Sequence, residues 1–183
     1  MKKIAVLLSG KGTTFAHIVR FLHGRECEVV LALSNKPDAE GLAIAQEHSI
    51  AHAVIEPKHF SSREAYDEAL VEMLRRYQPD LTVLAGFMRI LTAVFTEQIP
   101  AINLHPSLLP RHKGLHAIEK SYADSYPEGG VSVHYVSAEL DGGDIIIQKS
   151  LQKEGLSLET YTAGIKVIEK EAVTEAILHV LKD

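Results

Sequence analysis

Cysteine is nearly absent from this chain of 183 residues, and its absence limits what the fold can rely on. Cys27 is the only cysteine, which excludes an internal disulfide and a zinc site built from several cysteines. Long apolar runs are missing too, since no stretch approaches the roughly 20 residues of a membrane-spanning helix. The apolar run at residues 4–8 is shorter than the roughly seven residues of a signal-peptide core. We therefore expect a cytoplasmic protein with no membrane partner.

A surplus of positive charge is also missing. The formal net charge is −5 at pH 7, which argues against a surface that coats nucleic acid. Hydrophobic residues make up 46% and charged residues 23%, as is typical of a soluble globular protein. The length allows one domain with a real core, so we expect a single domain over residues 1–183. The oligomeric state stays open, a homodimer included.

Apolar runs alternate with helical patterns over the first hundred residues. The expected strands are residues 4–8, 28–33, 51–55, 81–85 and 101–104, and the expected helices are 14–23, 39–48 and 62–77. Ser61 and Glu64 have the spacing of a capping box before the third helix. The strands are apolar throughout rather than alternating, which predicts a sheet covered on both faces. This pattern indicates a parallel, doubly wound α/β sheet.

The pattern changes after residue 129. Residues 131–136 alternate between apolar and polar, and residues 144–151 are again rich in β-formers. Residues 157–181 predict one long helix, with Ser157 as a candidate cap and Thr160 as the alternative. The expected fold is therefore a mostly parallel, Rossmann-like sheet with an added antiparallel C-terminal β segment and a long C-terminal helix.

A glycine-rich turn, residues 9–14, lies between the first expected strand and helix. Backbone N–H groups at such a turn and at a helix N-terminus suit an anion, phosphate above all. The turn is not a Walker loop, because Gly12 rather than Ser or Thr follows Lys11. It is a poor dinucleotide fingerprint, because Phe15 takes the third glycine position. A phosphate monoester fits better, and a tight turn without a ligand is the alternative.

Asn103 and His105 stand two positions apart at the end of an apolar strand. Side chains at i and i+2 of a strand share one side, and Pro106 stops the strand because it lacks an N–H. An amide can donate to a developing oxyanion, and an imidazole can move protons near neutral pH. If Asp141 met His105, its charge would favour the protonated ring. The alternatives are a satisfied strand-end histidine and an ordinary turn at Asp141-Gly142.

The other chemistry-bearing residues have ordinary explanations. His112 and His116 are four apart, but Pro110 and Gly114 argue against a helix through them, so we expect no metal pair. Cys27 has no basic neighbour in sequence and is expected to be inert. The proline-containing segment 107–115 is a candidate mobile lid.

Several motifs, taken together, are similar to a known family. They are residues 4–14, 34–36, 62–67, 84–91, 103–110 and 139–143, which span nearly the whole chain. In this order and spacing they resemble the phosphoribosylglycinamide formyltransferase family, folate-dependent enzymes of purine synthesis. The resemblance implies transfer of the formyl group of 10-formyltetrahydrofolate to the amine of 5'-phosphoribosylglycinamide, in de novo synthesis of IMP. The folate is then a co-substrate, the partners are small molecules, and no metal is required.

The resemblance also implies a role for each matching residue. The catalytic residues match Asn103, His105 and Asp141, with Asp141 favouring the protonated form of His105. The residues that bind the phosphoribosyl substrate match Gly12, Thr13, Thr14 and Glu169. The folate-binding residues match Arg63, Met88, Arg89, Ile90, Leu91, Asn103, Ala138, Glu139, Leu140 and Asp141.

The chain departs from the family pattern at two places. Gly12-Thr13-Thr14 stands where the family usually has Gly-Ser-Asn, and we expect Thr14 still to cap the helix that follows. Lys166 and Lys170 stand where the family usually has Gln and His around the glutamate. We expect these lysines to add attraction for the substrate phosphate.

Other functions remain as alternatives. A formyltetrahydrofolate deformylase and a methionyl-tRNA formyltransferase belong to the same formyl-transfer group. Each usually carries a further domain, and the tRNA enzyme also needs a basic surface, so both are less expected here. A non-enzymatic nucleotide-binding module would explain the glycine-rich turn, but it would not explain Asn103, His105 and Asp141 together.

Overall fold

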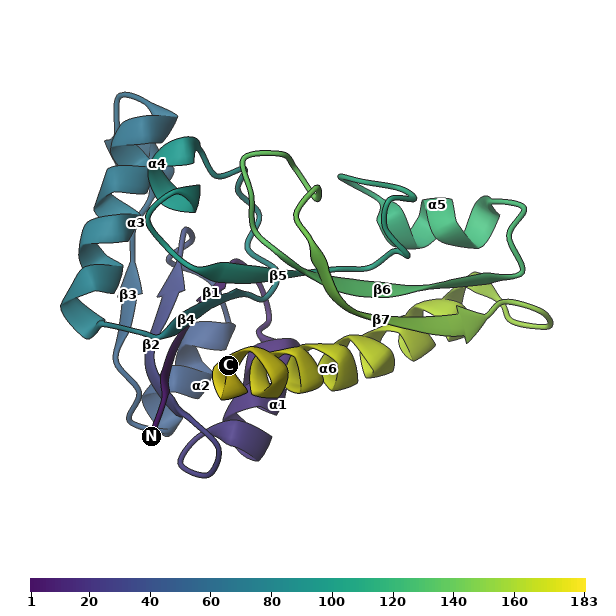
Figure 1. The fold of residues 1–183 in the computed structure, drawn as a ribbon, viewed down its shortest axis with the longest axis horizontal. Helices are drawn as coiled ribbons and strands as arrows, with labels where there is room; N and C mark the ends of the chain where they lie inside the picture. The colour runs from purple at the N-terminus through teal and green to yellow at the C-terminus, as the bar shows by residue number, and fades with distance from the viewer. The chain divides into compact units, whose positions relative to one another are not determined.

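The computed structural model describes residues 1–183, which separate into two compact units, Met1–Ile102 and Asn103–Asp183. The first unit is built on four parallel strands, with β1 paired to β2 and β4, and β2 paired to β3. Their bounds are β1 (Lys3–Leu8), β2 (Glu28–Ser34), β3 (His52–Val54) and β4 (Leu81–Leu84). Residues 4–8 of β1 are fully buried, as expected of a strand covered on both faces (Figure 1).

The helices of the first unit follow its strands. They are α1 (Thr13–Leu22), α2 (Gly41–Glu47), the 3-10 turn η1 (Pro57–His59), α3 (Arg63–Tyr77) and α4 (Ala93–Thr96). The helix α1 buries Phe15, Ile18, Val19 and Leu22, a spacing that places all four on one side of the helix. The structure has no helix long and apolar enough to cross a membrane.

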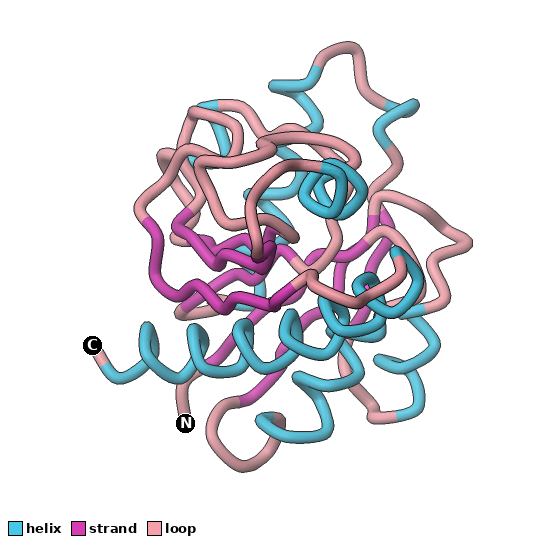
Figure 2. Tube along the Cα trace, turned by 90° about the vertical axis from the view of Figure 1, so that its right-hand side faces the viewer, coloured by secondary structure: helices cyan, strands magenta, loops and turns pink.

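Strand β5 (Ala101–His105) begins at the end of the first unit and enters the second. The second unit continues with α5 (Ala117–Ala123), β6 (Glu128–Tyr135), β7 (Ile145–Gln152) and α6 (Leu158–Lys182). Strands β6 and β7 are antiparallel, and α6 runs lengthwise beside them (Figures 1 and 2). The hydrogen-bonded strand order is β3-β2-β1-β4-β5-β6-β7.

The expected fold class is confirmed: a mostly parallel sheet ends in an antiparallel strand pair and a long helix. Ser157 caps α6 as expected, since its hydroxyl accepts from the Thr160 N–H at 3.1 Å. The expected cap of α3 was one residue early, because Ser62, not Ser61, accepts from the Ala65 N–H. The expected cap of α1 at Thr14 was also wrong: Gly12 is the N-cap residue, and Thr14 lies inside the first turn.

Candidate active site

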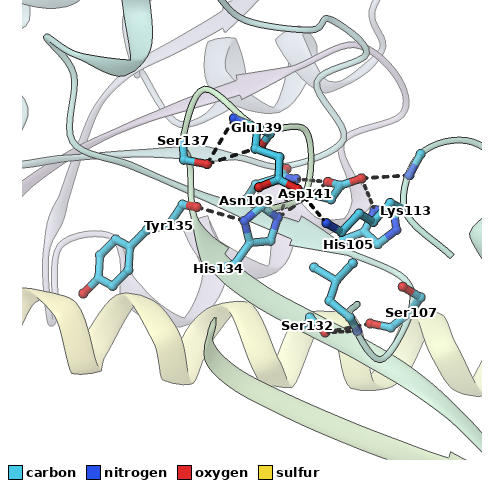
Figure 3. Close-up of polar contacts among 12 residues, drawn as sticks. Asn103, His105, Ser107, Lys113, Ser132, His134, Tyr135, Ser137, Glu139 and Asp141 are labelled. Atoms are coloured by element: carbon cyan, nitrogen blue, oxygen red, sulfur yellow. Dashed lines mark hydrogen bonds and ion pairs between the residues drawn. The ribbon is translucent and has the colours of Figure 1, made fainter. Parts of the chain in front are cut away.

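Strand β5 delivers Asn103 and His105 to one side, because they lie two residues apart before Pro106 (Figure 3). Ala101 and Ile102 anchor the strand in the core, and His105 is itself only 6% exposed. A buried imidazole needs partners for both ring nitrogens, and both are present. His105 Nδ1 lies 3.5 Å from Asp141 Oδ2, and His105 Nε2 lies 2.8 Å from the His112 carbonyl oxygen.

These contacts define the protonation that the site favours at His105. A carbonyl oxygen can only accept, so Nε2 carries a proton and donates it to His112. Nδ1 faces a carboxylate, which also accepts. An imidazole with acceptors at both nitrogens is best satisfied when both nitrogens are protonated. The arrangement therefore suits a cationic donor at the end of β5.

The turn between β6 and β7 carries Asp141 to the same place. Asp141 has a left-handed backbone (φ 50°), which Asp tolerates better than most residues. Two residues later the chain passes so close to the Tyr135 carbonyl that any side chain in place of Gly143 would collide with it. Asp141 Oδ2 also accepts from the Gly114 N–H at 2.8 Å, which fixes the carboxylate beside the histidine.

The environment of Asp141 keeps its carboxyl ionised. Burial by itself would raise the pKa of Asp141. The contact with His134, the N–H of Gly114 and the charge of His105 together outweigh burial, so its pKa lies below the ordinary value of 3.8. The buried carboxylate thus remains available as the counter-ion of His105.

His134, on β6, lies against the amide of Asn103, a contact that the sequence did not predict. His134 Nδ1 lies 2.9 Å from the Tyr135 carbonyl oxygen, so that nitrogen donates. His134 Nε2 lies 3.3 Å from Asn103 Nδ2 and 3.6 Å from Asp141 Oδ1; unprotonated it accepts from the amide, and protonated it donates to the carboxylate. The same amide nitrogen lies 3.5 Å from Asp141 Oδ1, so both neighbours orient its N–H groups (Figure 3).

The buried hydroxyl of Ser132 hydrogen-bonds to the segment that follows β5. Ser132 Oγ donates to the Ser107 carbonyl at 2.7 Å and accepts from the Leu109 N–H at 3.0 Å. Gln148 Nε2 also donates to Ser132 Oγ, at 2.9 Å. Alternation in residues 131–136 predicted a strand here, but the pairing that brings Ser132 to Ser107 is not visible in sequence.

Within the first unit, the glycine-rich turn ends at α1. Gly12 is left-handed (φ 74°) and packs against Gly41, whose Cα any Gly12 side chain would strike. The first N–H groups of α1 follow, and its first turn contains no acidic residue. These N–H groups have no acceptor within the helix, so they suit an anion. The close packing against Gly41 is also sufficient, without any ligand, to require glycine at position 12.

The first unit also brings together part of the expected folate set. Arg63, at the start of α3, donates to the Ile90 carbonyl at 3.1 Å, although the two are 27 residues apart. Met88 and Ile90 are exposed, at 67% and 56%. Arg89 lies over the Tyr66 ring, 4.9 Å from its centroid. The segment 88–91 therefore presents apolar side chains next to a fixed guanidinium.

Asp67, which the sequence did not single out, holds the end of that segment. It is 1% exposed, and its Oδ2 accepts from the Thr92 N–H at 2.6 Å and from the Thr92 hydroxyl at 2.7 Å. The helical spacing of α3 shows that residue 67 is near the buried face, but not that it meets Thr92.

In the second unit, Glu169 lies on α6 and is 6% exposed. Burial raises the pKa of Glu169, and the Lys166 ammonium, 3.6 Å away, lowers it only in part. A buried carboxylate whose pKa is perturbed in this way is commonly part of a functional site. The loop residues Ala138, Glu139 and Leu140 are exposed beside the buried Asp141.

Metal-binding clusters are absent: no three His, Cys, Asp or Glu residues lie together in a way that could hold an ion. His112 contacts Asp124 at 2.7 Å instead of forming a pair with His116. Cys27 is buried, and burial raises its pKa to about 11, so the thiol is not activated.

Comparison with known proteins identifies the family. The model of the formyl transferase family matches residues 2–177. The chain belongs to the formyl transferase family. It is 42% identical over 171 residues to the phosphoribosylglycinamide formyltransferase of Escherichia coli, covering 91% of this chain and 81% of that protein. The Haemophilus influenzae enzyme of the same name is 41% identical over 152 residues, covering 81% of this chain and 72% of its own.

A solved structure in the same family has the same fold. The phosphoribosylglycinamide formyltransferase of Campylobacter jejuni superposes with a TM-score of 0.96 at 44% sequence identity, over 98% of this chain and 97% of that one. Family membership makes this chain an enzyme that transfers a formyl group, as the resemblance of its motifs implied.

Proposed function

We propose that this chain transfers the formyl group of 10-formyltetrahydrofolate to the amine of 5'-phosphoribosylglycinamide, giving the N-formyl product and tetrahydrofolate in de novo purine synthesis. The observation that carries the proposal is the assembly of Asn103, His105 and Asp141 at the end of β5. Similarity to enzymes named for that substrate supports the choice of acceptor.

The proposed chemistry follows from the charges that develop. Attack of the amine on the formyl carbon places negative charge on the formyl oxygen. The Asn103 amide and the protonated His105 are the donors that stabilise this oxyanion. A proton must also leave the attacking nitrogen while another reaches the departing folate nitrogen. His105, with Asp141 as counter-ion, is the group that moves these protons through water.

Binding is proposed for residues of both units. In the first unit, Gly12, Thr13 and Thr14 bind the phosphoribosyl group through the N-terminus of α1. Glu169 of the second unit binds the same substrate. The folate is held by Arg63 and by residues 88–91 and 138–141, with Asn103 contributing to binding as well as to catalysis. We place the reaction in the cytoplasm and leave a homodimer as an assembly to be tested by ultracentrifugation.

Lys166 and Lys170 are proposed to add attraction for the substrate phosphate. Lys166 already faces Glu169 at 3.6 Å, and its side chain is about half exposed. If the attraction is electrostatic, replacing either lysine by Ala should raise the KM for the ribonucleotide most at low salt, where screening is weakest. An equal KM change at every ionic strength would contradict this role.

The deciding experiment mixes the purified protein with 10-formyltetrahydrofolate, with and without the glycinamide ribonucleotide. We expect folate release only when the ribonucleotide is present, together with a stoichiometric formylated product. Folate release that ignores the ribonucleotide would identify the enzyme as a hydrolase. Absence of both reactions would leave binding as the activity to be explained.

A further inference from the structure

A second polar cluster lies behind His105 and involves none of the residues assigned above. His112, in the segment between β5 and α5, has a left-handed backbone (φ 52°). Its carbonyl oxygen accepts from His105 Nε2 at 2.8 Å, and its own Nε2 lies 2.7 Å from Asp124 Oδ2. One residue thus touches the catalytic imidazole with its backbone and a carboxylate with its side chain.

Asp124 in turn is tied to a buried ammonium. Lys153, directly after β7, places Nζ 2.7 Å from Asp124 Oδ1, and its side chain is only 10% exposed. The same Nζ donates to the carbonyls of Ser121 at 2.7 Å and Asp124 at 3.1 Å, where α5 ends. A cation at a helix C-terminus is favourable, because the last carbonyls there lack partners. Lys153 therefore fixes both the end of α5 and the Asp124 carboxylate.

This chain of contacts ends at the catalytic ring. A left-handed non-glycine residue such as His112 persists only where its surroundings hold it. The Asp124 carboxylate supplies that hold through the imidazole side chain. If His112 relaxed to an ordinary backbone conformation, its carbonyl would turn away from His105 Nε2. The ring would then be oriented by Asp141 alone, at 3.5 Å.

We propose that Lys153, Asp124 and His112 are positioning residues that hold the His112 carbonyl against His105 Nε2 and so orient the catalytic imidazole. This inference rests on the proposed role of His105 in formyl transfer. None of the three residues is assigned to substrate or folate binding. Their loss should therefore lower kcat and leave KM for both substrates unchanged.

The kinetic test compares two substitutions at one position. In H112Q the side-chain amide can still donate to Asp124, whereas the Leu side chain of H112L has no donor. Both variants place a non-glycine residue in the same left-handed backbone conformation, so the backbone strain is matched. We expect kcat of H112L to fall about 10-fold, by analogy with other carboxylate–histidine supports, and kcat of H112Q to recover most of that loss. D124A should match H112L. Equal kcat values for H112L, H112Q and the wild type would overturn the proposal, as would a rise in KM that accounts for the whole loss.

A control and a spectroscopic readout separate this proposal from general destabilisation and from the proposed function. Lys149 of β7 forms an ion pair with Glu175 of α6 at 2.8 Å, and K149A should leave kcat unchanged. Nitrogen-15 NMR of the free protein reads the His105 ring directly, without any substrate. We expect a protonated Nε2 in the wild type and an altered His105 signal in H112L and D124A but not in K149A. Unaltered His105 signals in both variants would refute the positioning role even if formyl transfer itself failed in the assay.

Discussion

The side chains at the end of β5 show how few atoms the proposed chemistry needs. Asn103 is oriented by His134 and Asp141, and His105 by Asp141 and a backbone carbonyl. These contacts fix where the side chains lie before a substrate arrives, and an oxyanion would share or replace one of the present acceptors as it forms. Electrostatic stabilisation by preorganised donors is usually the largest contribution to such catalysis.

Removal of either donor should therefore lower kcat. We expect His105→Ala and Asn103→Ala each to lower kcat by about 10²–10³, as loss of one oxyanion donor does elsewhere. The measurement is steady-state folate release with saturating substrates. His48→Ala, at an exposed histidine after α2, is the matched control and should keep full turnover. Near-full turnover in His105→Ala would remove His105 from the mechanism.

Glu169 illustrates a residue whose environment opposes its charge. Because burial raises its pKa, the folded chain carries the ionised carboxylate at neutral pH at a cost in stability. Glu169→Gln removes that cost and should stabilise the protein by about 1 kcal/mol, or roughly 2–4 °C in melting temperature. The KM for the ribonucleotide should rise at the same time.

Thermal unfolding and steady-state kinetics together check this prediction. Glu171→Gln, at an exposed position of the same helix, should change neither quantity. A Glu169→Gln protein that melts below the wild type would show that the carboxylate is kept for stability rather than for substrate.

At the scale of elements, α3 and the segment after β4 depend on one carboxylate. Asp67 accepts two hydrogen bonds from Thr92 in a fully buried position. Asp67→Ala leaves a buried N–H and hydroxyl without an acceptor, and should lower the unfolding free energy by about 3 kcal/mol. Since segment 88–91 is proposed to bind folate, the KM for 10-formyltetrahydrofolate should also rise.

Urea unfolding and folate kinetics measure the two effects. Glu68→Ala, exposed on the same helix, should stay within about 0.5 kcal/mol of the wild type. An Asp67→Ala protein with unchanged folate KM would separate the stability of this segment from folate binding.

Which elements could be predicted depends on how much apolar pattern each one carries. Strands such as β1 and the 25-residue α6 have long, regular patterns, and the sequence predicts both. The helix α4 spans only 4 residues, too few for a helical period to be recognised; α5 was missed as well, although α2, also of 7 residues, was predicted. The cap of α1 is set by the left-handed Gly12, a choice that packing against Gly41 decides.

The contacts of the candidate site also differ in how far the sequence predicts them. Asn103 and His105 share one strand, so their relation follows from local geometry. Asp141 is 36 residues beyond His105, and only the family resemblance indicated that the two meet. The contacts of His134, His112 and Lys153 were not predicted, because strand pairing and a single backbone dihedral create them.

At the scale of the whole molecule, the proposed roles are shared between the two compact units. Unit Met1–Ile102 carries the anion-binding turn and the Arg63 segment, and unit Asn103–Asp183 carries the catalytic residues and Glu169. The second unit also contains both aspartates whose pKa values are lowered, Asp124 and Asp141. Its stability should therefore respond to acid in a defined direction.

Burial would raise the pKa of Asp124, but hydrogen bonds from Lys153, His112 and the Tyr126 N–H outweigh burial and lower it from 3.8 to about 2. The pKa of Asp141 is lowered as well. As pH falls, the unfolded chain therefore takes up protons at these carboxyls before the folded chain does. The stability they contribute is complete above about pH 4, and for Asp124 it is lost as pH falls toward 2.

We expect urea unfolding midpoints to be level, as far as these two groups decide, from pH 7 to 5 and to fall between pH 4 and 2. Asp124→Asn should be less stable at pH 7 and lose less of its remaining stability in acid, since Asn does not titrate. Asp38→Asn, at an exposed position of the first unit, should retain the full acid dependence. If Asp124→Asn kept the wild-type slope below pH 4, the Lys153–Asp124–His112 cluster would not be the source of this acid sensitivity, and Asp141 with its two histidines would have to account for it.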